Sequence, residues 1–480
     1  MKSIGKNAVF NVIYRGLNIV FPLVISVYVA RILNADGIGS VASVQNIVTY
    51  FTYIACLGIP AYGTKVIAGY MNNRKEMSRT FSELLCINII SAVIASSLYG
   101  ILIAVVPFFR EKILLYLIIG LLIPFSAVNV EWFYQGIEEY GYIMKRSFVV
   151  KILCLVLTFL WVKDKGDLAW YALTITLATT LNYLFNVIHI RKYIAFSLKD
   201  LCMKKHLKSI LILFAASIAT EVYVLGDTTM LTVIHGDTAV GYYYTSMRII
   251  AIIRTLVVSV AAVWYPRLSY YYLNGFQEKF KSFTDKGINL LLLCTIPSCL
   301  GIMLLAEDII PVVFGKGFAA SIVSTRILAV SIITVALSNF IGSQLFVVIG
   351  KEKMTFFSTV AGAVVNICLN LLLIFRFGHY GVAVASAFTE FCVTAFQWYV
   401  LTRKTGMKIK LYDLKSIVAA SLVMAGVVSG IKIFFTGNEA VRLFSGVCLG
   451  AVSFFITAFF MRNSILCEGV DWLKKKRKKA

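Results

Sequence analysis

The chain has 480 residues, of which 59% are hydrophobic and only 14% are charged, and its mean hydropathy is +0.84. Soluble domains are roughly 45–50% apolar and about 25% charged, so this composition excludes an ordinary soluble globular protein. The formal net charge of +23 is strongly basic and needs an explanation of its own.

Apolar runs of about 20 residues, the length that crosses ~30 Å of hydrocarbon, recur along the whole chain. The first run is too long for a signal-peptide core and no small-residue cleavage site follows it, so it predicts an uncleaved first span. The fifth run is short and carries Lys151 near one end, which leaves a twelve-span count open. The sequence predicts an all-α polytopic membrane protein with about fourteen transmembrane helices, near 9–31, 40–62, 83–106, 113–134, 147–162, 168–189, 209–233, 242–265, 287–310, 322–349, 355–375, 381–401, 415–435 and 441–461.

Basic residues concentrate in every second loop, for example in "RKYIAFSLKDLCMKKHLK", and in the tail "KKKRKK". Cytoplasmic loops carry such an excess of lysine and arginine, so we expect both termini to be cytoplasmic. This topology, together with contact to anionic lipids of the bilayer, explains the net charge without nucleic acid as a partner.

Two turns in the outside loops resemble each other. "LNADGIGSV" joins the first two predicted spans and "IHGDTAVGYY" joins the seventh and eighth; Gly39 and Gly241 align at an offset of 202. On the inside, "FYQGIEEYGY" and "VVIGKEKMTFF" align Gly136 with Gly350 at an offset of 214. Repeats of this kind are typical of transporters. We therefore expect an N-terminal six-helix bundle over 1–200, a C-terminal six-helix bundle over 201–410, and two additional helices with a basic cytoplasmic tail over 411–480.

Signs of catalysis are missing. No predicted loop exceeds about 20 residues, and the chain lacks the P-loop, HExxH and G-x-S-x-G motifs. Asp36 and Asp237 each stand alone in an outside turn, where aspartate is usually a turn residue. None of the ten cysteines lies in an outside loop and none forms a CxxC pair, so we expect neither a disulfide nor a metal site. The sequence predicts transport, not an enzyme.

Charged residues near the middle of a span cost about 2.5–3.5 kcal/mol each and need a reason. Residues within two turns of a span end can extend their side chains to the membrane surface, which we expect for Lys151, Arg326 and Lys432. Glu83 and Glu131 likewise lie near the predicted inner surface. Six further residues are candidates for a functional site: Arg15, Glu221, Asp227, Arg248, Arg254 and Glu390.

Spans seven and eight form a predicted antiparallel hairpin that brings two acids level with two arginines. Counting from the shared turn pairs Glu221 with Arg254 and Asp227 with Arg248. Six residues separate the two positions by about 120° around a helix, so both pairs cannot point at the partner helix. We expect at least one arginine, Arg254 first, Arg248 second and Arg15 third, to bind phosphate oxygens in a cavity. The alternative for each pair is that the acid and the arginine only neutralise each other. Glu390 is a candidate either for a coupling-ion site or for a buried structural glutamate.

The N-terminal segment "KNAVFNVIYRGLNIVFPLVISVYVARILNADGIGSVASVQNIVTYFTYIACLGIPAYG" resembles the bacterial repeat-unit flippases of O-antigen and capsule synthesis. These belong to the polysaccharide branch of the multidrug/oligosaccharidyl-lipid/polysaccharide exporter superfamily. "WFYQGIEEYGYIMKRS" and "VGYYYTSMRI" are similar to two further signatures of that branch.

The resemblance implies two six-helix bundles that form a central cavity and alternate between inward and outward openings. It implies an undecaprenyl-diphosphate-linked oligosaccharide as cargo, carried across the bacterial cytoplasmic (inner) membrane, with no cofactor. Some members couple transport to protons or sodium, and the polymerase and chain-length proteins of the same pathway are implied partners. Arg15, Arg248 and Arg254 match the expected location of the cationic cavity residues, and the terminal helix pair can help to hold the lipid tail.

Two other functions in the same superfamily stay open: a cation-coupled multidrug exporter, which would favour acids in its cavity, and a lipid II flippase. Aromatic residues cluster at helix ends, which is normal for membrane interfaces. Stacking of Tyr243 or Trp132 on a sugar is a further hypothesis.

Overall fold

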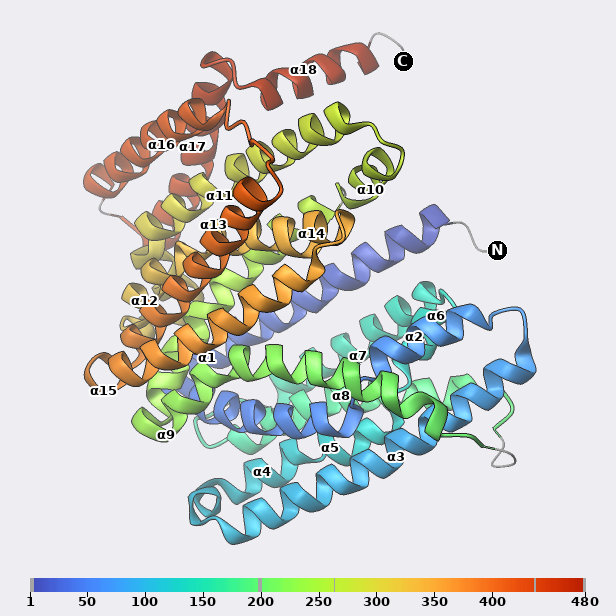
Figure 1. Cartoon of the computed structure of the whole chain (residues 1–480). Helices are drawn as coiled ribbons and strands as arrows, with labels where there is room; N and C mark the ends of the chain where they lie inside the picture. Colours follow the sequence, from blue (N-terminus) through green and yellow to red (C-terminus); the bar gives the residue numbers. More distant parts are fainter. Residues whose placement is uncertain (1–3, 197–200, 263, 436, 478–480) are drawn as a thin grey trace. The chain divides into compact units, whose positions relative to one another are not determined.

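The computed structural model describes residues 4–196, 201–262, 264–435 and 437–477. Within these ranges almost every residue is helical and no strand occurs, which confirms the all-α prediction (Figure 1). Nine of the described helices are long and apolar enough to cross a membrane. The protein is therefore a multi-pass membrane protein.

Three of the longest helical segments each consist of two helices joined by a sharp turn at one non-helical residue. The turn residues are Asn34 in α1 (Ile4–Cys56; φ 57°), Gly236 in α9 (Lys204–Ala262; φ 72°) and Gly378 in α15 (Glu352–Tyr399; φ 54°). With these three helices divided, each of the fourteen predicted spans has a helical counterpart. The short fifth span is a 22-residue helix, α7 (Tyr140–Trp161), which begins before the predicted boundary and is long enough to cross the membrane.

The chain divides into two compact units, residues 1–241 and 242–480, and the boundary lies within α9. The bundle limits expected at 200/201 and 410/411 stay predictions. The helices of the first unit are α1 (Ile4–Cys56), α2 (Ile59–Gly69), α3 (Arg74–Val105), η1 (Pro107–Lys112), α4 (Ile113–Gly120), α5 (Leu122–Phe125), η2 (Ser126–Val128), α6 (Glu131–Gly136), α7, α8 (Leu168–Ile190) and the first part of α9 (Lys204–Ala262).

In the first unit, local sequence signals set the ends of several helices. Asn73 caps α3, because its side chain accepts a hydrogen bond from the backbone N–H of Glu76 at 3.2 Å. α2 begins with Pro60 in its first turn, where a proline costs no hydrogen bond. At this end of the unit, α2, α3 and α6 enclose an aromatic core in which Trp132 stacks on Phe81, with ring centroids 5.6 Å apart.

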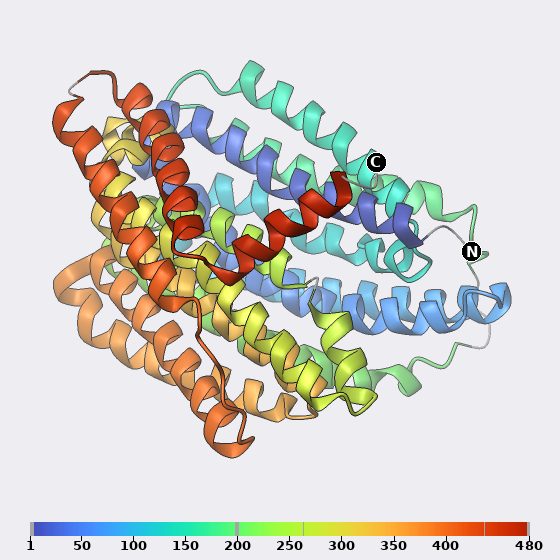
Figure 2. The same ribbon diagram turned by 90° about the horizontal axis from the view of Figure 1, so that it is seen from above.

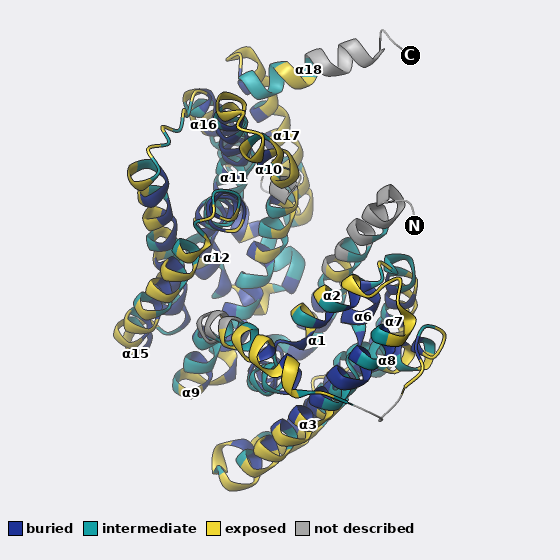
Figure 3. Cartoon of the chain, turned by 45° about the vertical axis from the view of Figure 1, so that its right-hand side comes forward, coloured by how far each residue is buried: buried dark blue, intermediate teal, exposed yellow. Residues whose placement is uncertain are grey.

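The lipid-facing and core-facing sides of α3 are plain in its sequence. Leu84 and Ala95 are fully buried, whereas Ile90 and Val93 on the other side are more than half exposed. Exposed apolar residues continue along α3 and α15, and Figure 3 shows exposed positions along both helices. In hydrocarbon, burying leucine or valine against protein yields no hydrophobic free energy, because the lipid tails are equally apolar. These exposed apolar sides are therefore those expected of membrane-spanning helices.

The second unit contains the rest of α9 and all later helices. α16 and α17 run side by side as an antiparallel pair (Figure 2). The other bounds are α10 (Tyr265–Leu273), α11 (Gln277–Phe314), η3 (Lys316–Phe318), α12 (Ser321–Ala329), α13 (Ser331–Ser338), η4 (Asn339–Leu345), α14 (Phe346–Val348), α15 (Glu352–Tyr399), η5 (Val400–Lys404), α16 (Leu414–Phe434), α17 (Glu439–Phe460) and α18 (Ser464–Arg477).

Polar contacts hold this terminal pair to α11 at both of its ends. At one end the guanidinium of Arg442 on α17 donates to the fully buried Asp308 of α11 at 2.7 Å, through Nε. At the other end Asp413, just before α16, accepts from the backbone N–H of Ser464 at 2.9 Å and donates its own N–H to Asn289 at 3.2 Å. The final pair is therefore a fixed part of the second unit.

Arg326 and Lys432 do not simply extend to the membrane surface as expected. Both donate to Glu307 of α11, at 2.7 and 2.6 Å. These three residues therefore form an ion-pair cluster that joins α11, α12 and α16.

Candidate functional site

The two outside turns are structurally equivalent. Asn34 and Gly236 both have a positive φ, and they are separated by 202 residues, the offset that the sequence alignment of Gly39 with Gly241 predicts. Positive φ is accessible mainly to glycine and, less readily, to asparagine, which explains the residue at each turn. The repeat of these two turns is confirmed.

The two helices that follow these turns approach each other closely, and the close approach requires a glycine on each helix. A Cβ atom at Gly39 would overlap the carbonyl oxygen of Asp237, and a Cβ atom at Gly241 would overlap the carbonyl oxygen of Ala35. The two contacts are related by the same offset of 202, so the backbones cross in a reciprocal, pseudo-symmetric contact. Both glycines belong to the first unit.

The inside repeat exists, but the predicted alignment is wrong by two residues. Glu138 and Gly350 are the residues with positive φ, and each is followed by a residue whose N–H reaches back five positions: Glu139 to Tyr134 and Lys351 to Phe346. This is the Schellman termination of a helix. Gly136 is glycine for a different reason, since a Cβ there would press on Ile67.

The sequence position of Asp237, just after Gly236, suggests a simple turn residue, but the structure shows a different role. Asp237 is buried, and its carboxylate accepts hydrogen bonds from the hydroxyls of Ser40 and Ser43 and from the ammonium group of Lys112. It also begins the second half of α9, where a negative charge is favoured by the helix dipole. Asp36, by contrast, is exposed, and its carboxylate accepts a hydrogen bond from Thr238 at 3.1 Å. Asp237 therefore ties α1, η1 and α9 together.

Arg254, the first candidate for phosphate binding, lies on α9 in the second unit. Its Nη2 is 3.7 Å from Oε1 of Glu390 on α15. The distance is that of a weak ion pair, and the two side chains keep 26% and 17% of their surface exposed. A guanidinium group has five N–H donors, so this contact leaves capacity for an anion.

Arg248 lies two turns earlier on the same helix and is oriented by an aromatic neighbour. Its Nη1 donates to the hydroxyl of Tyr244 at 2.7 Å, and its guanidinium carbon is 5.6 Å from the centre of that ring. One tyrosine thus fixes the arginine without neutralising its charge.

The acidic candidates of α9 lie in the first unit. The hydroxyl of Tyr53 donates to Glu221 at 2.6 Å, and Asp227 is buried. The pairings of Glu221 with Arg254 and of Asp227 with Arg248 stay predictions. The side chain of Arg15 lies outside the described residues.

Residues 4–272 match the family described as "Polysaccharide biosynthesis protein". The chain belongs to this family. The expectation drawn from the N-terminal segment is thereby confirmed.

Relatives of this polysaccharide biosynthesis protein are named for transport. A Shigella dysenteriae protein named "Putative O-antigen transporter" is 23% identical over 82% of this chain and 98% of its own length. A Haloferax volcanii protein named "Probable low-salt glycan biosynthesis flippase" is 28% identical over 49% of this chain and 50% of its own length. Among solved structures, an inward closed lipid II flippase matches 95% of this chain and all of its own chain with a TM-score of 0.77 at 17% identity, a likeness of fold. The protein is a membrane transporter of polysaccharide biosynthesis, not an enzyme.

The first unit contains a buried ion pair that was not predicted from the sequence. Arg146 of α7 donates to Glu131 at 2.7 Å with only 4% of its side chain exposed, and the hydroxyl of Tyr14 donates to the same carboxylate at 2.9 Å. The sequence placed Arg146 in a loop because the fifth span was started one residue after it. Glu131 is accordingly part of an internal network and not simply a residue near the surface.

Glu83 is also a buried node and not a residue near the surface. It is fully buried and accepts from Lys205 at 2.7 Å, from the N–H of Cys202 at 2.8 Å, and contacts Nε2 of His206 at 2.8 Å. The node anchors the beginning of α9 to α3. The run "KKH" just before the seventh span was the one available signal.

The hypothesis that Tyr243 or Trp132 stacks on a sugar is wrong, because both are 97% buried by other parts of the protein. The Tyr243 hydroxyl is 2.9 Å from that of Ser386, and Trp132 lies under Phe81 and against Gly63. Both aromatic rings are core residues.

Proposed function

We propose that this protein is a flippase that moves an undecaprenyl-diphosphate-linked oligosaccharide repeat unit from the cytoplasmic to the outer leaflet of the bacterial inner membrane. The observation that carries the proposal is the pair of arginines on α9 and their neighbours among the described residues. There, Arg254 is paired with the carboxylate of Glu390 at 3.7 Å, and Arg248 is held by the uncharged Tyr244.

The chemistry of such a cargo matches these side chains. A diphosphate and several sugars cannot cross hydrocarbon unaided, because their polar groups would lose water without any replacement. Arginine offers a planar fork that pairs with two phosphate oxygens at once, and it stays charged at every physiological pH. In a multidrug exporter, these arginines would repel a cationic substrate.

Alternating access is part of the same proposal. The crossing of α1 and α9 at Gly39 and Gly241, together with the ion pair between Lys112 and Asp237, is suited to closing the outer side. The first contact is a close approach of two backbones and the second is an ion pair between side chains. Both can separate without unfolding a helix. The proposed topology, with both termini in the cytoplasm, places these contacts on the outer side.

Coupling to protons or sodium also belongs to the proposal. Glu390 is the first candidate because its carboxylate shares its charge with Arg254 and remains 17% exposed. Binding of a phosphate to Arg254 would compete with Glu390 for the guanidinium and leave the carboxylate available to a coupling ion. Asp227 and Glu221 are the further candidates.

The test is a deletion strain complemented with variants of similar expression. We expect deletion to remove one surface glycan and to leave its lipid-linked repeat unit on the inner leaflet. We expect Arg254→Ala to fail in complementation and Arg376→Ala, which alters an exposed arginine of α15, to succeed. A normal glycan with accumulation of a drug would instead indicate an exporter, and rescue of a strain depleted of its lipid II flippase would indicate that cargo.

A further inference from the structure

The second unit contains a cavity that is separate from the arginines of α9. It has a volume of about 640 Å³ and lies between α11, α13, the end of α15, η5 and the start of α16. Phe391 and Tyr399 at its rim are 55% and 56% exposed, so the cavity is open on the surface of the unit. Arg248, Arg254 and Glu390 do not line it.

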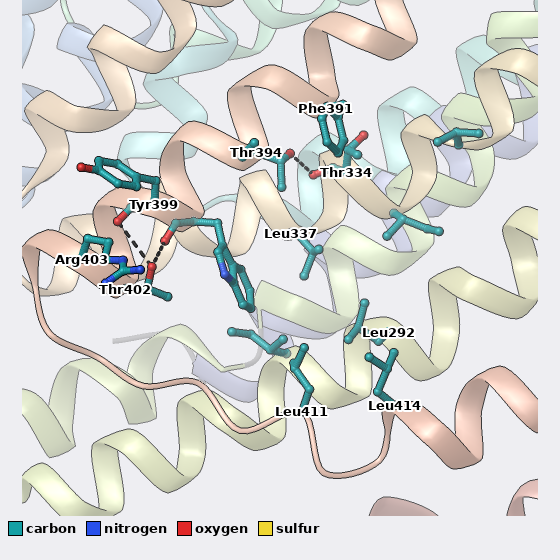
Figure 4. Close-up of a pocket in the computed structure, with 15 residues that line it drawn as sticks. Leu292, Thr334, Leu337, Phe391, Thr394, Tyr399, Thr402, Arg403, Leu411 and Leu414 are labelled. Atoms are coloured by element: carbon teal, nitrogen blue, oxygen red, sulfur yellow. Dashed lines mark hydrogen bonds between the residues drawn. The ribbon is translucent and has the colours of Figure 1, made fainter.

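The walls of this cavity, which we call the α11–α15 groove, are suited to hydrocarbon. Figure 4 shows leucines from α11, α13, α16 and the loop before α16 converging on it: Leu292, Leu337, Leu414 and Leu411. The hydroxyls of Thr394 and Thr402 in the wall donate their hydrogens to backbone carbonyls of the protein. Thr394 donates to the carbonyl oxygens of Thr334 and Glu390, both at 2.8 Å, and Thr402 donates to that of Trp398 at 2.9 Å. With these hydroxyls satisfied within the protein, the walls offer an occupant apolar contact.

One end of the groove carries a positive charge. Arg403 lies there beside Thr402 and Tyr399, on the π-helical turn η5 (Figure 4). Arg403 is exposed, and within the described part of the chain no carboxylate forms an ion pair with it. A π-helical turn in a long helix is often found at a functional site.

The basic character continues immediately after Arg403. Lys404 lines a second cavity of about 600 Å³, whose other charged residues are Lys281, Lys351, Lys408 and a single acid, Glu278. In the proposed topology this end of α15 faces the cytoplasm, where the leaflet carries anionic lipids. A Lys or Arg near that surface contributes about 1 kcal/mol to the attraction of an anionic lipid.

We propose that the α11–α15 groove binds one anionic glycerophospholipid of the cytoplasmic leaflet, with an acyl chain against its leucines and its phosphate at Arg403. The volume falls in the ~300–1,000 Å³ range of small-ligand sites. An apolar wall with a cation at one end is complementary to a chain with an anionic headgroup. A zwitterionic lipid would fill the same walls but gain less from Arg403 and the neighbouring lysines.

Trp398 lines the groove and provides a direct probe. Full-length protein is reconstituted in vesicles that contain brominated phosphatidylglycerol or brominated phosphatidylcholine, and bromine quenching of tryptophan fluorescence is measured. The difference between the native chain and Trp398→Phe isolates the signal of the groove. We expect half-maximal quenching of Trp398 at about fivefold lower mole fraction of phosphatidylglycerol than of phosphatidylcholine.

Two variants separate the headgroup from the chain. Arg403→Gln should reduce the preference for phosphatidylglycerol while quenching by both lipids persists, and Arg376→Gln, at an exposed arginine on the same helix, should keep the full preference. Ala395→Phe should fill the groove and reduce quenching by both lipids. A preference unchanged in Arg403→Gln overturns the proposal. So does displacement of brominated phosphatidylglycerol by an equimolar amount of undecaprenyl phosphate, which would assign the groove to a polyprenyl chain.

Discussion

Gly39 and Gly241 are related by a reciprocal contact: each lies where the backbone carbonyl of the opposite helix leaves no room for a side chain. The same spacing of 202 residues separates the two glycines and the two turn residues, Asn34 and Gly236. The repeat in the sequence is thus a repeat of three-dimensional geometry, and it brings the starts of the second and eighth spans together.

The first prediction follows from this contact. Gly39→Ala should lower the melting temperature of the purified protein and impair transport, because the new methyl group overlaps the carbonyl of Asp237 and forces the helices apart. Overpacking of this kind typically costs about 1–3 kcal/mol. Gly100→Ala on α3 is the matched control, since nothing lies within 4 Å of its Cβ position. Equal thermal stability of the two variants would contradict the close approach.

The second prediction concerns Lys112 and Asp237. Removal of either partner leaves a buried or half-buried charge, which typically costs about 3–5 kcal/mol. Asp237→Asn should therefore reduce thermal stability far more than Asp36→Asn, the exposed acid of the equivalent turn. The combination Lys112→Asp with Asp237→Lys should recover part of the loss. A double variant no better than the worse single variant would show that the pair acts through something other than charge.

The third prediction compares two consecutive acids of α11. Asp308 is fully buried against Arg442, whereas Glu307 is 47% exposed beside Arg326 and Lys432. Asp308→Asn should release α17 from α11 and cost about 3–5 kcal/mol. Glu307→Gln should cost about 1 kcal/mol or less, because exposed ion pairs are largely replaced by water. Thermal unfolding in detergent, followed by tryptophan fluorescence, measures both, and a larger effect at Glu307 would refute this ranking.

The spans and turns could be predicted because they depend on local signals: runs of apolar residues, glycine at a position of positive φ, and lysines between spans. The partners of the charged residues could not. Lys112 and Asp237 are 125 residues apart, and no periodicity connects them. Arg146 was missed because a shift of one helix boundary moves a residue from a loop into a buried network.

The candidate site shows the same limit. Counting residues from the turn shared by spans seven and eight identified Arg248 and Arg254 as arginines within the membrane. This count considers only those two neighbouring helices. The carboxylate that the structure places beside Arg254 comes from α15, a helix whose rotation the sequence does not specify. Tyr244 could have been recognised, since it lies four residues before Arg248 and such residues are neighbours on a helix.

The last prediction tests how Arg248 is held. Tyr244→Phe keeps the ring beneath the guanidinium but removes the hydroxyl that accepts from Nη1 at 2.7 Å. A hydrogen bond to a charged group contributes about 1.5–3 kcal/mol, so transport of the lipid-linked cargo should fall by about tenfold or more if Arg248 must be oriented to bind phosphate. Tyr244→Ala should be worse, because the ring is lost as well. Tyr270→Phe, at an exposed tyrosine of α10, should transport normally. Should Tyr244→Phe also transport normally while Arg248→Ala does not, the charge of Arg248 would matter but its orientation by Tyr244 would not.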